Sequence, residues 1–188
     1  PGQSAWMSLS EAPQILRSLQ DTGTLEILIL SGEVHPQNPR RKDWFNLIYR
    51  LCQLSLALGF LPHTNAGILS FEEMTKLKKI NVSMGLMLEQ IAPKFQHTVH
   101  RHAPSKDPAL RQQQLEWAGE LGIPFTTGLL LGIGETPDDW QATLGTIAQI
   151  HRRWGNIQEV ILQPHSPGDR QSCSQEAFDL SRLPEVVQ

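Results

Sequence analysis

The apolar residues of this chain alternate between short continuous runs and runs with helical spacing. Continuous runs of aliphatic residues predict strands, and apolar residues three and four positions apart predict amphipathic helices. The strands are expected at 25–30, 59–62, 80–84, 123–131 and 157–163. The helices are expected at 9–20, 39–58, 107–121 and 136–154, with a further helix that begins at Ser70. The run at 25–30 has no polar alternation, which predicts a buried strand.

Alternating strands and helices favour an α/β fold with a parallel sheet and right-handed crossovers. Polar residues follow the expected strands at 31–33, 63–65, 83, 132–135 and 163–165. A (β/α) barrel builds its active site at these ends of its strands, but a full barrel needs eight strands and about 250 residues. We therefore expect a partial (β/α) TIM-type barrel of about five βα units. A five-stranded doubly wound sheet fits the pattern as an alternative.

Two helix starts carry recognisable capping signals. Ser70 stands three residues before Glu73, which is the spacing of a capping box. Thr136 precedes Pro137 and two aspartates, a typical start with proline in the first turn. The stretch 94–108, which contains three lysine or arginine residues and three histidines, is expected to be irregular.

Composition narrows the function classes. The formal charge of −3 gives no attraction to nucleic acid or to an anionic membrane. No apolar stretch approaches the roughly 20 residues that cross a bilayer, and the N-terminus carries no signal peptide pattern. Two cysteines, Cys52 and Cys173, are too few for a disulfide scaffold. We expect a cytoplasmic protein with no nucleic acid or membrane partner.

Three features can carry ligand chemistry. Glu33 follows Gly32 after a strand, where its carboxylate could hold an amine, although a turn with a solvated Glu is an alternative. The segment 132–135 (Gly-Ile-Gly-Glu) exposes backbone against which an adenine ring could lie, or it is a simple strand-to-helix turn. Arg111 could take a carboxylate with both arms of its guanidinium, or it is a solvated helix residue.

The histidines and cysteines do not form a convincing metal site. His97, His100 and His102 lie close in sequence, but no acidic ligand stands among them, and a transition-metal site needs more ligands in a defined shell. Cys52 falls on the apolar face of a helix and is expected in the core. Cys173 is expected to be an incidental thiol in a polar loop.

Taken together, these segments resemble the radical S-adenosylmethionine (SAM) superfamily, and within it the CofG family of deazaflavin (FO) synthases. The resemblance runs from about residue 6 to residue 163 and is carried by 61–70 (LPHTNAGILS), 81–89 (NVSMGLMLE), 103–106 (APSK), 111–128, 132–136 (GIGET) and 156–163 (NIQEVILQ). The joint occurrence of these segments is far more specific than any one of them.

The resemblance implies two cofactors, SAM and a 4Fe-4S cluster, and assigns residues to SAM. The amine would be held at Gly32 and Glu33, the ribose near Ser83 and the carboxylate at Arg111. The adenine would lie beside Gly132, Ile133, Gly134 and Glu135. The small-molecule substrate would face His63, Thr64, Asn65 and Gln163.

The implied activity is a radical SAM lyase that acts on a small molecule. A CofH-type partner would supply 5-amino-5-(4-hydroxybenzyl)-6-(D-ribitylimino)uracil. A 5′-deoxyadenosyl radical would abstract hydrogen from it, and ring closure with loss of ammonia would give 7,8-didemethyl-8-hydroxy-5-deazariboflavin. An electron donor would reduce the cluster. Another radical SAM reaction on the same scaffold is an alternative, because residues that bind SAM do not name the substrate.

One departure from the family pattern concerns the cluster. The family holds its cluster with three cysteines in a C-x3-C-x2-C loop, which this chain does not contain. We expect this loop upstream of Pro1, and 1–188 to be a single radical SAM core domain truncated at both ends. The fragment alone is expected to be inactive and to have open sheet edges. A non-catalytic remnant is a further alternative.

Overall fold

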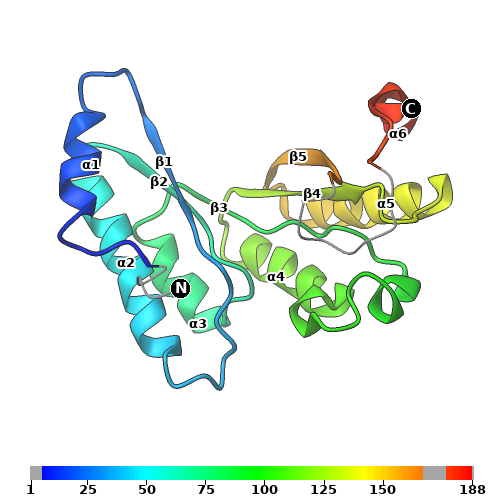
Figure 1. Ribbon diagram of the computed structural model, residues 1–188, viewed down its shortest axis with the longest axis horizontal. Helices are drawn as coiled ribbons and strands as arrows, with labels where there is room; N and C mark the ends of the chain where they lie inside the picture. Colours follow the sequence, from blue (N-terminus) through cyan, green and yellow to red (C-terminus); the bar gives the residue numbers. More distant parts are fainter. Residues whose placement is uncertain (1–5, 167–176, 188) are drawn as a thin grey trace. The chain divides into compact units, whose positions relative to one another are not determined.

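The computed structural model describes residues 6–166 and 177–187 of the chain, which form parts of two compact units, 1–84 and 85–188. The first unit contains α1 (Ala12–Ser18), β1 (Glu26–Leu30), α2 (Arg41–Ala57), β2 (Leu61–Asn65), α3 (Phe71–Lys78) and the start of β3 (Ser83–Gly85). The second contains two 3-10 helices (Pro93–His97 and Pro104–Lys106), α4 (Pro108–Glu120), β4 (Phe125–Leu131), α5 (Pro137–Trp154), β5 (Ile157–Pro164), a third 3-10 helix (Leu180–Arg182) and α6 (Leu183–Val186) (Figure 1).

The strands pair in the order β1-β2-β3-β4-β5. Glu26 lies opposite Leu61 in the parallel pair of β1 and β2, and β4 pairs in parallel with β5. This sequential order is that of a (β/α) barrel, whereas a doubly wound sheet reverses its strand order at a switch point. The α/β class and the partial-barrel prediction are confirmed, and the doubly wound alternative is wrong.

In the first unit, α2 packs on β1 and β2 (Figure 1). Its buried residues Trp44, Ile48 and Cys52 stand four positions apart and therefore share one face of the helix. Cys52 is fully buried, which confirms its predicted place in the core.

In the second unit, the apolar face of α5 contains Trp140, Ile147 and Ile150, which are all buried. The predicted start of α5 is confirmed, because Thr136 forms a capping box with Asp139. The helix ends at Gly155, whose φ of 66° is the left-handed conformation that glycine adopts without strain.

The expected burial of β1 is wrong. Leu25, Leu28 and Leu30 are 72%, 54% and 65% exposed, and only Ile29 of the strand is buried. A continuous apolar run predicts burial on both faces, as in the interior of a covered parallel sheet. Among the described strands, β1 pairs with β2 alone, and part of its surface stays open.

Two strand boundaries also differ from the predicted ones. The strand expected at 59–62 begins instead at Leu61, because Gly59 adopts a φ of 89° and turns the chain after α2. The strand expected at 80–84 is confined to 83–85, since the Asn81 side chain donates to the Leu77 carbonyl oxygen at 3.1 Å and extends the turn after α3. The stretch 94–108, expected to be irregular, contains two 3-10 helices.

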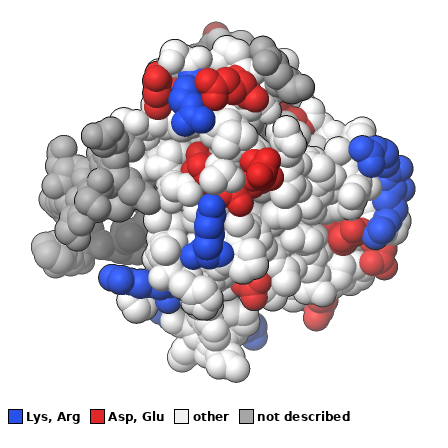
Figure 2. Space-filling model, turned by 90° about the vertical axis from the view of Figure 1, so that its right-hand side faces the viewer, with Lys and Arg blue, Asp and Glu red and all other residues white. Residues whose placement is uncertain are grey.

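The surface carries no concentrated charge on the face shown in Figure 2, where acidic and basic side chains are intermixed. Within the described ranges, no helix combines the length and the apolar character required to span a lipid bilayer.

Candidate functional site

In the first unit, the segment 31–33 directly follows β1, as predicted. Ser31 donates its backbone N–H to the Asn65 carbonyl oxygen at 3.1 Å, and its hydroxyl accepts from the Trp44 indole at 2.7 Å. The next two residues, Gly32 and Glu33, are exposed. Ser31 therefore fixes the start of this segment, and the carboxylate that follows is accessible to a ligand.

His63 and Ser83 are brought together in the same unit. Both are buried, and the His63 Nδ1 and Ser83 Oγ atoms share a hydrogen bond of 2.7 Å. The two residues lie opposite each other in the pairing of β2 with β3. His63 lies inside β2, which corrects the prediction that it follows the strand, because β2 begins at Leu61 and continues to Asn65. Ser83 is the first residue of β3.

Thr64 points away from His63, because successive side chains of a strand alternate between its faces. Its hydroxyl donates to Asn81 Oδ1 at 2.7 Å and lies 3.3 Å from the Cys52 thiol of α2. Burial raises the pKa of that thiol, although the hydrogen bonds with Thr64 and Asn81 oppose the shift. Asn65, the last residue of β2, is half-buried.

In the second unit, Arg111 is 2% exposed, so the alternative of a solvated helix arginine is wrong. Its Nε donates to the Ser105 carbonyl oxygen at 2.9 Å, and its Nη1 donates to the Met87 carbonyl oxygen. Nη1 also lies 3.4 Å from Glu89 Oε1. Arg111 is buried because backbone oxygens and a carboxylate compensate its charge.

Glu89 is the centre of this charged cluster, and sequence reasoning did not assign it a role. Its side chain is 9% exposed, Lys106 donates to its Oε1, and His100 Nε2 lies 3.2 Å from its Oε2. Oε2 makes no hydrogen bond with any described group, and the same holds for the His100 Nε2 atom that faces it. Burial lowers the pKa of His100, although the negative charge of Glu89 opposes this shift.

The backbone at Glu89 is also unusual. Its φ of 68° is left-handed, which is uncommon for a residue other than glycine. The Glu89 N–H donates to the Gly128 carbonyl oxygen at 2.9 Å, and its own carbonyl oxygen accepts from Leu130 at 3.3 Å. These bonds to β4 hold Glu89 in this conformation and direct its side chain toward Arg111 and Lys106. A carboxylate directly after an apolar run was the signal available in the sequence.

The segment 132–135 follows β4, as predicted, and its carboxylate is used within the loop. Glu135 Oε1 accepts from the Gly132 N–H at 2.6 Å, and Oε2 accepts from the Ile133 N–H at 2.8 Å. Gly132 and Gly134 have φ values of 88° and 97°, which favour glycine. Ile133 is buried and Gly134 is exposed.

Gln163 is exposed and lies at the end of β5, one residue before the last residue of the strand, Pro164. Cys173 lies outside the described residues. Among the residues that the structure describes, no group of His, Cys, Asp or Glu side chains could hold a metal ion.

The comparison with family models decides the identity of the fold. The model of the radical SAM superfamily matches residues 1–147. The chain belongs to the radical SAM superfamily. The superfamily in general uses SAM and a 4Fe-4S cluster.

Named relatives narrow the similarity within the radical SAM superfamily. The chain is 66% identical over 187 residues to a 7,8-didemethyl-8-hydroxy-5-deazariboflavin synthase of Trichormus variabilis, and 56% identical to one of a Synechocystis species. Each match covers the whole chain but only 55% and 60% of the relative. The chain therefore spans about half the length of the curated relatives that it matches.

A solved structure supports the fold. The crystal structure of methylornithine synthase (PylB) superposes with a TM-score of 0.70 at 14% sequence identity, and the match covers 87% of this chain and 45% of that one. At this identity the likeness concerns the fold alone.

Proposed function

We propose that this chain supplies the SAM-binding part of a radical SAM enzyme that forms 7,8-didemethyl-8-hydroxy-5-deazariboflavin. The observation that carries the proposal is the similarity of 56–66% over the chain to relatives of that name. The substrate is the hydroxybenzyl–ribitylaminouracil adduct made by a CofH-type partner, and the product forms by hydrogen abstraction and ring closure with loss of ammonia. SAM, when bound beside a cluster reduced by an electron donor, supplies the hydrogen-abstracting group.

In the first unit, the proposed SAM ligands are Gly32, Glu33 and Ser83. An exposed carboxylate after a flexible glycine suits an ammonium group, because a charge-assisted hydrogen bond is roughly twice as strong as a neutral one. The Ser83 hydroxyl can accept one hydrogen bond and donate another, and one of these is shared with His63. The ribose hydroxyls of SAM are suitable partners for the other.

In the second unit, the proposed ligands are Arg111 and the loop of Gly132, Ile133, Gly134 and Glu135. The fit with SAM is supported by the buried Glu89 Oε2 atom, which has no hydrogen-bond partner among the described residues. An acceptor in this state requires a donor, and the amine and hydroxyls of SAM are donors. Arg111 beside it supplies a positive charge for a carboxylate.

The Gly132 loop supports the proposal through its backbone. Phe178 lies on Gly132, where an added Cβ atom would stand 2.8 Å from the Phe178 Cβ atom. Gly134, with its positive φ and exposed surface, is the part of the loop where an aromatic ring can approach main-chain groups. Glu135 holds the loop in this conformation by accepting two of its N–H groups. We therefore assign Glu135 to the adenine site as the residue that shapes it.

For the substrate, the proposed contacts are His63, Thr64, Asn65 and Gln163. His63 is the best placed of these to move a proton, because its Nδ1 is fixed by Ser83 and its imidazole has a second nitrogen. The Thr64 hydroxyl is engaged with Asn81 and would contribute through packing.

The cluster does not fit the residues that the structure describes. Cys52 is the one cysteine among them, and it is buried against Thr64. No step of the proposed reaction is therefore assigned to cluster ligands of this chain.

The test uses the full-length protein with a reconstituted cluster. Supplied with the CofH product, SAM and a reductant, it should form a fluorescent deazaflavin. Titration calorimetry should show SAM binding, and Arg111→Lys should weaken it by about tenfold or more, since a lost charged hydrogen bond costs roughly 1.5–3 kcal/mol. Arg153→Lys, at an arginine paired with Glu116 on the surface, is the control. Failure to bind SAM would refute the proposal.

A further inference from the structure

A single arginine links two loops of the first unit. Arg41, the first residue of α2, donates from Nη1 to the Val34 carbonyl oxygen at 2.6 Å and from Nη2 to the Ile68 carbonyl oxygen at 2.9 Å. Val34 directly follows Glu33, and Ile68 directly follows Gly67. The guanidinium therefore holds the loop after β1 and the loop after β2 at a fixed separation.

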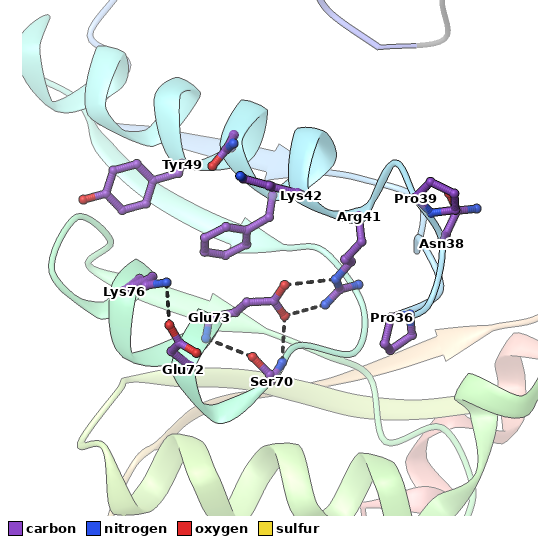
Figure 3. A pocket seen from close by; sticks show the side chains of 12 residues that line it. Pro36, Asn38, Pro39, Arg41, Lys42, Tyr49, Ser70, Glu72, Glu73 and Lys76 are labelled. Carbon is purple, nitrogen blue, oxygen red and sulfur yellow. Dashed lines mark hydrogen bonds and ion pairs between the residues drawn. The ribbon is translucent and has the colours of Figure 1, made fainter.

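Glu73 of α3 holds this guanidinium in place. Its Oε1 accepts from Arg41 Nε at 3.0 Å and its Oε2 from Nη2 at 2.5 Å, as Figure 3 shows. Glu73 is itself fixed by the capping box with Ser70, because its Oε2 accepts from the Ser70 N–H at 2.8 Å. The Arg41 side chain is 11% exposed, so that its hydrogen bonds are largely shielded from water. Only the planar fork of an arginine can serve all of these acceptors together.

The Glu33 side chain lies directly on Gly67. A Cβ atom added at Gly67 would stand 2.0 Å from Glu33 Cγ and 2.7 Å from its Oε1, whereas ordinary contact begins at 3.4 Å. Gly67 also has a φ of 74°, which glycine adopts without strain. Any other residue at this position must displace the Glu33 carboxylate.

We propose that Arg41 and Gly67 are positioning residues for Glu33. Arg41 sets the distance between the two loops, and Gly67 provides the surface on which the Glu33 side chain lies. This inference rests on the proposed function, in which Glu33 accepts a hydrogen bond from the SAM amine. A charged hydrogen bond has a narrow range of favourable distances and angles. If the Glu33 carboxylate is displaced by about 1 Å, its hydrogen bond to the SAM amine loses most of its strength.

The first test compares two glycines in the full-length protein. Gly59 has a φ of 89° but open space around its Cβ position. Gly67→Ala and Gly59→Ala therefore share the backbone strain, and only Gly67→Ala displaces Glu33. By calorimetry, Gly67→Ala should weaken SAM binding by about tenfold or more, while Gly59→Ala stays within about twofold of the natural protein. Binding of 5′-methylthioadenosine, which lacks the amine, should be unchanged in both.

The second test uses Arg41→Lys, which retains the charge but not the fork, so that the proposal stays testable if Gly67→Ala does not fold. It should weaken SAM binding in the same way, whereas Lys76→Gln, which removes an exposed pair with Glu72 on α3, should not. In a Glu33→Ala background, neither Gly67→Ala nor Arg41→Lys should weaken binding further.

The outcomes separate this inference from the function on which it rests. If Glu33→Ala binds SAM normally, the amine contact of the proposed function is wrong. If Glu33→Ala weakens binding but Gly67→Ala behaves like Gly59→Ala, the positioning role of Gly67 is wrong. Equal losses for SAM and 5′-methylthioadenosine would mean a general structural role, which also contradicts the inference.

Discussion

Gly128 lies in the middle of β4, where the neighbouring strand leaves no room for a side chain. A Cβ atom at this position would stand 2.0 Å from the Ile161 carbonyl oxygen of β5 and 2.7 Å from Met87 Cε. The methionine tip can rotate away, but the carbonyl oxygen belongs to the backbone of the paired strand. To restore an ordinary contact of 3.4 Å, β5 would have to move by about 1.4 Å, the difference between the two distances.

The cost of Gly128→Ala follows from this displacement. Overpacking in a closely packed interior costs roughly 1–3 kcal/mol. A shift of this size also breaks the parallel ladder around the pair of Gly128 and Ile161, and each lost hydrogen bond adds roughly 1 kcal/mol. We expect the free energy of unfolding to fall by about 3–5 kcal/mol. In a domain of this size the melting temperature should fall by about 10 °C or more.

Gly145→Ala is the matched control for this prediction. A Cβ atom at Gly145 of α5 would meet no heavy atom within 4 Å, so the new methyl group has open space. Alanine also gains about 1 kcal/mol over glycine within a helix. The free energy of unfolding of this variant should therefore stay unchanged or rise by up to about 1 kcal/mol.

The assay is urea and thermal unfolding of both variants, followed by circular dichroism in parallel with the natural protein. Equal losses at Gly128 and Gly145 would refute the reasoning, because the argument depends on whether packed backbone or open space meets the new methyl group.

Three further predictions concern buried polar groups. Glu89→Gln should lower the free energy of urea unfolding by about 3 kcal/mol or more, because Arg111 loses its carboxylate partner. Lys106→Met should lower it by less, since the Lys106 side chain is 32% exposed, and a larger loss for Lys106→Met than for Glu89→Gln would contradict this. Cys52, with its raised pKa and full burial, should react with iodoacetamide at pH 8 only as the protein unfolds, and rapid native labelling by mass spectrometry would contradict this. Because burial lowers the pKa of His100 in the folded protein, the unfolded chain binds more protons at this residue than the folded chain does. The free energy of unfolding should therefore fall as the pH falls through the ordinary histidine pKa of 6.5, and His100→Gln should reduce that loss in unfolding measurements.

The starts of α3 and α5 could be predicted from the sequence because their signals are local. Ser70 with Glu73, and Thr136 with Asp139, satisfy the free N–H groups of the first turn within four residues of chain. The C-terminal ends of the helices lie within a few residues of the predicted ends for the same reason. Gly155, for example, closes α5 through its own backbone conformation.

The environment of Arg111 could not be predicted in this way. The residue stands among polar neighbours at 112–114, a pattern typical of a solvated face. Its burial depends on Met87, Ser105 and Glu89, which come from segments up to 24 positions away. Hydrophobic periodicity contains no information about such long-range compensation of a charge.

The error in the burial of β1 has its physical source in the sheet around the strand. An apolar run marks residues that can be buried, but it does not state which neighbours will cover them. Leu28 and Leu30 satisfy the pattern of a buried strand and are exposed, because the described residues provide β1 with a single paired neighbour. Strand burial is a property of the sheet, whereas helix capping is a property of the segment.

Charged residues that resemble ligands in the sequence can instead form hydrogen bonds that hold the backbone of ligand-binding loops. Glu135 gives both carboxylate oxygens to N–H groups of its own loop, and Arg41 gives its guanidinium to carbonyl oxygens of two loops and to Glu73. Each of these charges acts on backbone, so it determines where neighbouring groups such as Glu33 lie. A substitution at such a residue should therefore change affinity through geometry, and a conservative replacement that keeps the charge but alters the hydrogen-bond pattern should not restore it.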